Sequence, residues 1–126
     1  MALYAEIVGI VAPSEAVAGS RVDIQVKIKN RSASPIGIMA SGALEYGVTP
    51  YPGVEFPANW ANVDPGAVQT FYGSFTMPSS GVKIHAYSYY YTAEGWYFDD
   101  EMTKVIDLAT LTPQVSEFKI ADFNKV

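Results

Sequence analysis

The side chains best suited to chemistry in this chain are a single histidine, one run of acidic residues and a block of aromatic rings. His85 lies in the alternating segment 82–86, VKIHA. A Ser-His-Asp site would need this histidine beside a serine on a strained turn, and the sequence has no nucleophile-elbow motif. One histidine without any cysteine also offers no transition-metal cluster. We therefore expect His85 to pack on a sheet surface among tyrosines, and we predict that the protein is not an enzyme and has no metal site or cofactor.

Asp99, Asp100 and Glu101 form the only acidic cluster. Three carboxylates suit calcium, which takes roughly 6–8 oxygen ligands. Adjacent residues of a strand point to opposite faces, however, so these carboxylates converge only if the backbone bulges. The sequence also lacks an Asp-x-Asp-x-Asp-Gly loop. We favour a solvated strand segment or an edge-protecting charge, with calcium binding as the alternative.

The aromatic block gives the strongest indication of a binding function. Alternation places Tyr87, Tyr89 and Tyr91 on one face of a strand, which Tyr97 on the hairpin partner can join. Three tyrosines can bury roughly 450–750 Å², and a soluble domain rarely exposes an apolar patch beyond about 300–600 Å². We expect the loop 47–66, the C-terminal segment, a partner protein or a sugar ring to cover this surface. The candidate binding residues are Tyr87, Tyr89, Tyr91, Tyr97, Trp60 and Trp96.

The clearest structural pattern is the segment 22–30, VDIQVKIKN. Its apolar residues recur at every second position, which places them on one face of a strand and Lys27 and Lys29 on the other. This pattern is typical of an antiparallel sheet with one face in a core and one in water.

Further strands are predicted at 3–11, 36–46, 67–77, 82–92 and 96–108, and Ala93-Glu94-Gly95 connects the last two as a tight hairpin. The segment 47–66 is dense in glycine and proline, so we expect a long loop with at most one short edge strand. The spacing of strands and turns predicts an all-β, immunoglobulin-like antiparallel β-sandwich of about seven strands. Residues 1–110 are expected to form this sandwich and 111–126 a C-terminal extended segment or linker. The expected inward-facing residues are Val22, Ile24, Val26, Ile28, Phe71, Phe75, Ile84, Ala86 and Phe98.

Composition excludes several classes of partner. The net charge is −5, and the eight basic residues form no cluster, which argues against nucleic-acid binding. No apolar segment approaches the roughly 20 residues needed to span a membrane. The first residues, MALYAEIVGIV, lack a basic region and are interrupted by Glu6, so they do not predict a secretory signal.

Two parts of the sequence resemble CARDB-type modules, the cell-adhesion-related domains of bacteria and archaea. The segment 13–22, PSEAVAGSRV, leading to 26–30, VKIKN, looks like the opening of such a module. The segments 64–66, DPG, and 73–78, GSFTMP, followed by an aromatic strand and Gly95-Trp96, resemble the latter half of related prokaryotic and phage surface modules. The resemblance spans about residues 3–108. It implies an immunoglobulin-like fold and a non-catalytic role as a spacer, adhesion or assembly domain.

We therefore predict a structural or adhesive module that presents loops and an aromatic sheet face to a protein partner or to its own copies. The alternative is a carbohydrate-binding module that uses tyrosine and tryptophan rings as stacking platforms. The sequence leaves the localisation open, and we favour a virus particle or a cell surface, as part of a larger assembly. The missing secretory signal departs from a secreted adhesin and favours a virus-particle origin or a module excised from a longer chain.

Overall fold

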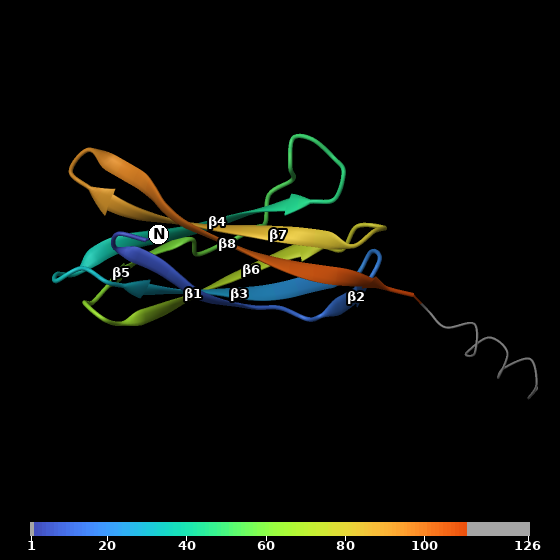
Figure 1. The fold of residues 1–126 in the computed structure, drawn as a ribbon, viewed down its shortest axis with the longest axis horizontal. Coiled ribbons are helices and arrows are strands. Elements are labelled where there is room, and N and C mark those ends of the chain that lie inside the picture. Colours follow the sequence, from blue (N-terminus) through green and yellow to red (C-terminus); the bar gives the residue numbers. More distant parts are fainter. Residues whose placement is uncertain (1, 111–126) are drawn as a thin grey trace, which may run out of the picture.

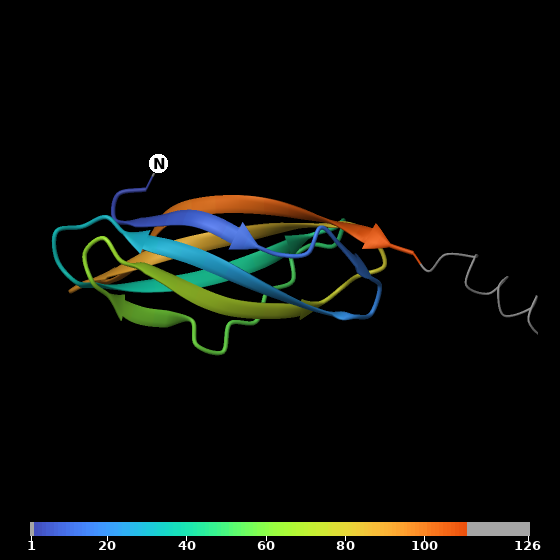
Figure 2. The same cartoon turned by 90° about the horizontal axis from the view of Figure 1, so that it is seen from below.

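Alternation of apolar and polar residues produces strands throughout residues 2–110, the part of the chain that the computed structural model describes. The elements are β1 (Ala5–Val11), β2 (Glu15–Val17), β3 (Arg21–Asn30), β4 (Ile36–Glu45), β5 (Trp60–Val63), β6 (Val68–Thr76), β7 (Val82–Thr92) and β8 (Gly95–Ala109). They form a three-stranded sheet, β1-β3-β6, packed on a five-stranded sheet, β2-β8-β7-β4-β5 (Figures 1 and 2). The described residues contain no helix long and apolar enough to cross a membrane. The segment 111–126, predicted to be extended or a linker, lies outside the described residues.

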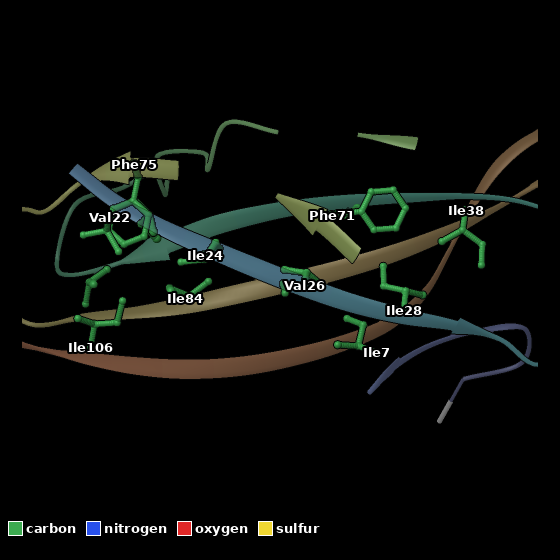
Figure 3. Packing of buried hydrophobic residues seen from close by; sticks show 14 of the residues in the cluster. Ile7, Val22, Ile24, Val26, Ile28, Ile38, Phe71, Phe75, Ile84 and Ile106 are labelled. Atoms are coloured by element: carbon green, nitrogen blue, oxygen red, sulfur yellow. The ribbon is translucent and has the colours of Figure 1, made fainter. Parts of the chain in front are cut away.

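The all-β, immunoglobulin-like sandwich predicted from the sequence is confirmed, and the core lies between the two sheets (Figure 3). The apolar residues at every second position of β3 all point inward, and Val26 and Ile28 are fully buried. They pack against inward residues of β7 such as Ile84, while Lys27 and Lys29 lie on the outer side. Eight of the nine residues predicted to face inward are buried, namely Val22, Ile24, Val26, Ile28, Phe71, Phe75, Ile84 and Ala86.

The predicted strand boundaries agree with the structure within about two residues. The segment 47–66 contains one short edge strand, β5, as allowed by the sequence. The strand β2 was not predicted, because a three-residue strand carries too few positions to show alternation. It pairs with β8 in parallel, whereas the other strand pairs are antiparallel.

Phe98 is the one residue of the predicted inward-facing set that does not face the core. The pairing of β7 with β8 shifts register between Ser88 and Tyr89, where Asp99 has no partner on β7. A single extra residue reverses the two faces of the strand beyond it. Phe98 therefore pairs with Tyr89 on the outer side and is 56% exposed. Tyr97, which was predicted to join the tyrosine face, instead pairs with Tyr90 on the opposite side.

The same bulge closes one open side of the sandwich. The Asp99 carboxylate accepts hydrogen bonds from the backbone N–H groups of Leu3, Tyr4 and Ala5, at 2.7, 2.8 and 2.6 Å. The neighbouring Asp100 carboxylate accepts one from Ile7, at 3.0 Å. These N–H groups belong to β1 and to the two residues before it, at the free edge of the three-stranded sheet, beside β8 (Figure 2). Carboxylates of the five-stranded sheet thus accept hydrogen bonds from backbone N–H groups at the edge of the three-stranded sheet.

The loop 46–59 closes the opposite side. Its backbone bridges to β4 at Ala43 and Gly53 and to β6 at Glu55 and Ser74. Val54 lies against Gly42, and the Phe56 ring lies over Gly73, so the two glycines leave room for these side chains.

Candidate functional site

One surface of the molecule gathers the exposed aromatic rings, and it is the outer side of the five-stranded sheet. Strand β7 contributes Tyr87, Tyr89 and Tyr91, which pair with Glu101, Phe98 and Trp96 of β8. Phe98 contacts both Tyr87 and Tyr89 edge-on, with ring centroids 6.1 and 5.9 Å apart. Trp60 of β5 pairs with Met39 and reaches Trp96 across the sheet, at 6.2 Å. We call this surface the aromatic face, defined by Trp60, Tyr87, Tyr89, Tyr91, Trp96 and Phe98.

One end of the aromatic face is hollowed into a groove of about 610 Å³, within the usual range for small-molecule sites. Trp60, Tyr91 and Trp96 provide its aromatic walls and are 55%, 53% and 36% exposed. We call it the aromatic groove; it is lined by Gly37, Met39, Asn59, Trp60, Asn62, Tyr91 and Trp96. Every one of these seven residues is uncharged.

Gly37 determines the shape of this groove. A β-carbon at this position would lie 3.1 Å from Cβ of Tyr91 and 3.4 Å from the indole ring of Trp96. Strand β4 therefore needs a residue without a side chain at this position for Trp96 to lie across it. The structure thus places the Tyr91 and Trp96 rings at the point where β4 has no side chain.

His85 holds the other end of the aromatic face together. Its Nδ1 lies 2.8 Å from Oε2 of Glu101 on β8, and its Nε2 lies 2.8 Å from Oε1 of Glu45 on β4. The ring lies between those of Tyr51 and Tyr87, at centroid distances of 5.6 and 6.3 Å and near-parallel angles. The prediction that His85 packs among tyrosines on a sheet surface is confirmed. We call this arrangement the histidine clamp.

The geometry of the clamp favours the imidazolium form, because only the charged ring has a donor on both nitrogens. Hydrogen bonds to Glu101 and Glu45 raise the pKa of His85, against a smaller opposing effect of burial. The hydrogen bond from His85 lowers the pKa of Glu45. Burial raises the pKa of both Tyr51 and Tyr87 above the ordinary tyrosine value. The clamp links three strands and one loop through a single titratable group.

The structure brings five of the six predicted binding residues onto one surface. Tyr97 lies on the other side of the sheet, where its ring is 5.9 Å from that of Tyr90. Sequence reasoning missed Phe98, Asn59, Asn62 and the two clamp carboxylates. The pairing of His85 with Thr103 and Ala43 places Glu101 and Glu45 two residues along the neighbouring strands, on its own side of the sheet. Such partners become visible only once the register is known.

The three carboxylates of the acidic cluster bind separate groups of the protein and do not converge on one point where an ion could bind. Asp99 and Asp100 accept hydrogen bonds from backbone amides of β1 and of the two residues before it, while Glu101 binds His85 on the opposite face. Within residues 2–110 no group of three or more histidine, cysteine, aspartate or glutamate side chains is arranged to hold a metal ion.

The loop 46–59 covers only part of the aromatic face. Its Tyr51 stacks on His85, but Val54 and Phe56 are used to close the side of the sandwich. Asn59, the last residue of the loop, and Trp60, the first residue of β5, line the groove instead of capping it. Tyr91 and Phe98 remain more than half exposed among the described residues.

Comparisons with known proteins give the fold alone. No family model matches the sequence, and no curated protein matches it. Solved structures with a similar fold include the CARDB domain of a Pyrococcus furiosus protein in complex with di-metal ions, with 9% identity and a TM-score of 0.57 over 84% of this chain and 90% of that one. A Bordetella pertussis protein assigned as ApaA has 9% identity and a TM-score of 0.56 over 88% of this chain and 100% of that one. The predicted resemblance to CARDB domains is thus confirmed at the level of the fold.

A similar fold also forms part of a DNA repair enzyme. The alkylpurine DNA glycosylase AlkC of Pseudomonas fluorescens, bound to DNA containing an abasic-site analogue, has 11% identity and a TM-score of 0.61 over 85% of this chain. This chain spans only 31% of the length of AlkC.

Proposed function

We propose, from the immunoglobulin-like fold that this chain shares with CARDB domains, that it is a non-catalytic structural or adhesive module whose aromatic face binds a protein partner. Its own copies are the partner we consider first. The setting we propose is a larger assembly, such as a virus particle or a cell surface.

The observation that supports this proposal is the concentration of exposed rings on the outer side of the five-stranded sheet. Four of its six rings, those of Trp60, Tyr91, Trp96 and Phe98, are between 36% and 56% exposed and leave roughly 300–500 Å² of aromatic surface. A standard protein interface buries about 800 Å² on each partner, with aromatic residues at its centre and polar residues at its rim. The aromatic face could supply such a centre, and Glu45, Lys83, Glu101 and Thr103 border it as a polar rim.

Sedimentation of the full chain over a wide range of concentrations tests this proposal. We expect a concentration-dependent dimer that is lost in Phe98→Ser and Tyr89→Ser. Tyr72→Ser is the matched control, because Tyr72 is 64% exposed on the three-stranded sheet and should leave the dimer intact. A full-length chain that stays monomeric at every concentration would contradict binding to its own copies.

The aromatic groove favours carbohydrate binding as a second candidate function. Aromatic rings beside amide groups offer both the apolar contact and the hydrogen bonds that a sugar requires. Under this proposal the chain stays monomeric and the groove, not the whole face, is the site.

A further inference from the structure

We infer that the aromatic groove binds one neutral pyranose ring, at a chain end or branch of a glycan, and that Asn59 and Asn62 select it through its hydroxyl groups. The inference rests on the second function proposed above and names the ligand class and its recognition elements. It is carried by the lining residues, by the angles between the rings and by the absence of charge among them.

The two asparagines are placed to recognise a polar ligand. Asn62 lies on β5 two residues from Trp60, so both side chains are on the outer side of the sheet. Asn59 is fixed by its backbone, because its carbonyl accepts a hydrogen bond from Ala40 at 2.9 Å. Among residues 2–110 neither side-chain amide is engaged in an intramolecular hydrogen bond, although each carries two donors and an acceptor. Sugar hydroxyls can satisfy both kinds of group.

The angles between the rings indicate a cradle, not a flat platform. The Trp96 ring is inclined by 63° to that of Trp60 and by 63° to that of Tyr91. A row of coplanar sugars would need coplanar rings, whereas one sugar can contact two inclined walls. The groove therefore suits a single ring with its apolar C–H groups against the indoles.

Charge selects against acidic sugars. No lining residue can pair with a carboxylate, and the chain as a whole carries a net charge of −5. A uronic acid would enter the groove without a counter-charge and would be repelled by the rest of the molecule. A neutral hexose or N-acetylhexosamine has neither disadvantage.

The test is tryptophan fluorescence of the full chain, titrated with methyl glycosides of neutral hexoses, with N-acetylglucosamine and with methyl glucuronide. Trp60 and Trp96 are the only two tryptophans in the sequence, so both fluorophores report from the groove. We expect a saturable change with at least one neutral sugar and none with the glucuronide. A hexamer of the preferred sugar should bind within about threefold of its methyl glycoside, because only one ring enters the groove.

Asn59→Ala/Asn62→Ala keeps both fluorophores and should weaken binding by roughly 4- to 100-fold, since each lost hydrogen bond is expected to cost a factor of roughly 2–10. Tyr72→Ala, with its exposed ring on the opposite sheet, should bind as the wild type does. Circular dichroism and thermal unfolding would show that both variants are folded.

The inference is overturned if no neutral sugar gives a saturable signal up to about 100 mM, a range that covers even weak binding. It is also overturned if the double asparagine variant binds unchanged, or if a hexamer binds far more tightly than one ring. If fluorescence instead changes with protein concentration and this change is lost in Phe98→Ser, the sugar inference fails while the protein-binding function stands. If a strictly monomeric chain binds sugar, the sugar inference stands and binding to its own copies fails.

Discussion

Removal of the Asp99 carboxylate should detach β1 from β8. In the structure this one side chain accepts three backbone hydrogen bonds from residues 3–5. We expect Asp99→Ala to lower the free energy of unfolding and to expose the amide of Ala5 to exchange. Asp99→Asn keeps one acceptor oxygen but directs an NH₂ group at the backbone donors, so it should have an intermediate effect.

The magnitude follows from what becomes of the three donors. Leu3 is 66% and Tyr4 41% exposed, so water can replace the carboxylate at their amides, and each loss should cost less than about 1 kcal/mol. Ala5 is fully buried, and its N–H group would lose its partner at a cost of about 1–3 kcal/mol. We expect a total of about 2–4 kcal/mol for Asp99→Ala, a large change for a domain of this size.

Urea unfolding at pH 7, together with amide exchange, measures both effects. Asp23→Ala is the matched control, because its carboxylate is 73% exposed and pairs only with Arg21. Such an exposed ion pair should contribute little to stability, because solvent screens it. If Asp99→Ala unfolds within about 0.5 kcal/mol of the wild type, or if protection at Ala5 is unchanged, the proposed attachment of β1 is wrong.

Three further changes test other parts of the structure. Because Glu101 and Glu45 raise the pKa of His85, the histidine clamp should stabilise the fold fully below the ordinary histidine pKa of 6.5 and lose this contribution as pH rises through the raised value. The difference in urea midpoint between wild type and His85→Gln should therefore shrink from about pH 6 to about pH 9. A difference that stays constant over this range would contradict the clamp. Asn30→Ala should cost about 2–4 kcal/mol in urea unfolding, because the buried amide donates to Ser34 and Val63 and accepts from Ser32; a loss below about 0.5 kcal/mol would refute this role. Gly37→Ala should shift the emission of Trp96 while changing stability by less than about 1 kcal/mol, because its β-carbon presses on Tyr91 and Trp96; unchanged emission would show that the groove tolerates the methyl group.

The sequence predicts the sandwich well where apolar and polar residues alternate. In the segment 22–30 each position is assigned to a face by its own side chain, so the register follows directly. The same reasoning fails at 96–98, where Trp96, Tyr97 and Phe98 are all aromatic and give no sign of which faces the core.

The bulge at Asp99 could nevertheless have been inferred by comparing the two ends of β8. Counting back from the buried Ile106 in steps of two assigns Phe98 to the inner side. Counting forward from the hairpin pair Thr92–Gly95 assigns Trp96 and Phe98 to the outer side, with Tyr91. One extra residue between the two reconciles these assignments, and the acidic cluster lies at that point.

The candidate site was less predictable than the fold. Alternation placed Tyr87, Tyr89 and Tyr91 correctly on one surface, because they belong to one strand. The groove depends on Gly37, Trp60, Tyr91 and Trp96, which come from four strands whose order the sequence does not specify. Only the pairing of β5 with β4, of β4 with β7 and of β7 with β8 brings them together.

Similarity of fold to a DNA-bound glycosylase does not transfer DNA binding to this chain. Binding to the phosphate backbone needs clustered lysine and arginine. This chain has a net charge of −5, and Arg21 and Arg31 are each paired with a carboxylate. We therefore retain the expectation that the partner is not a nucleic acid.

Hydroxyl-radical footprinting of the wild-type chain at low and high concentration tests most directly whether the aromatic face is a contact surface for its own copies. Phe98, Tyr91 and Trp60 are each more than half exposed in the single chain, as is Tyr72 on the opposite sheet. We expect oxidation of the first three to fall at high concentration while that of Tyr72 stays constant. Equal oxidation of all four residues at both concentrations would contradict such a contact.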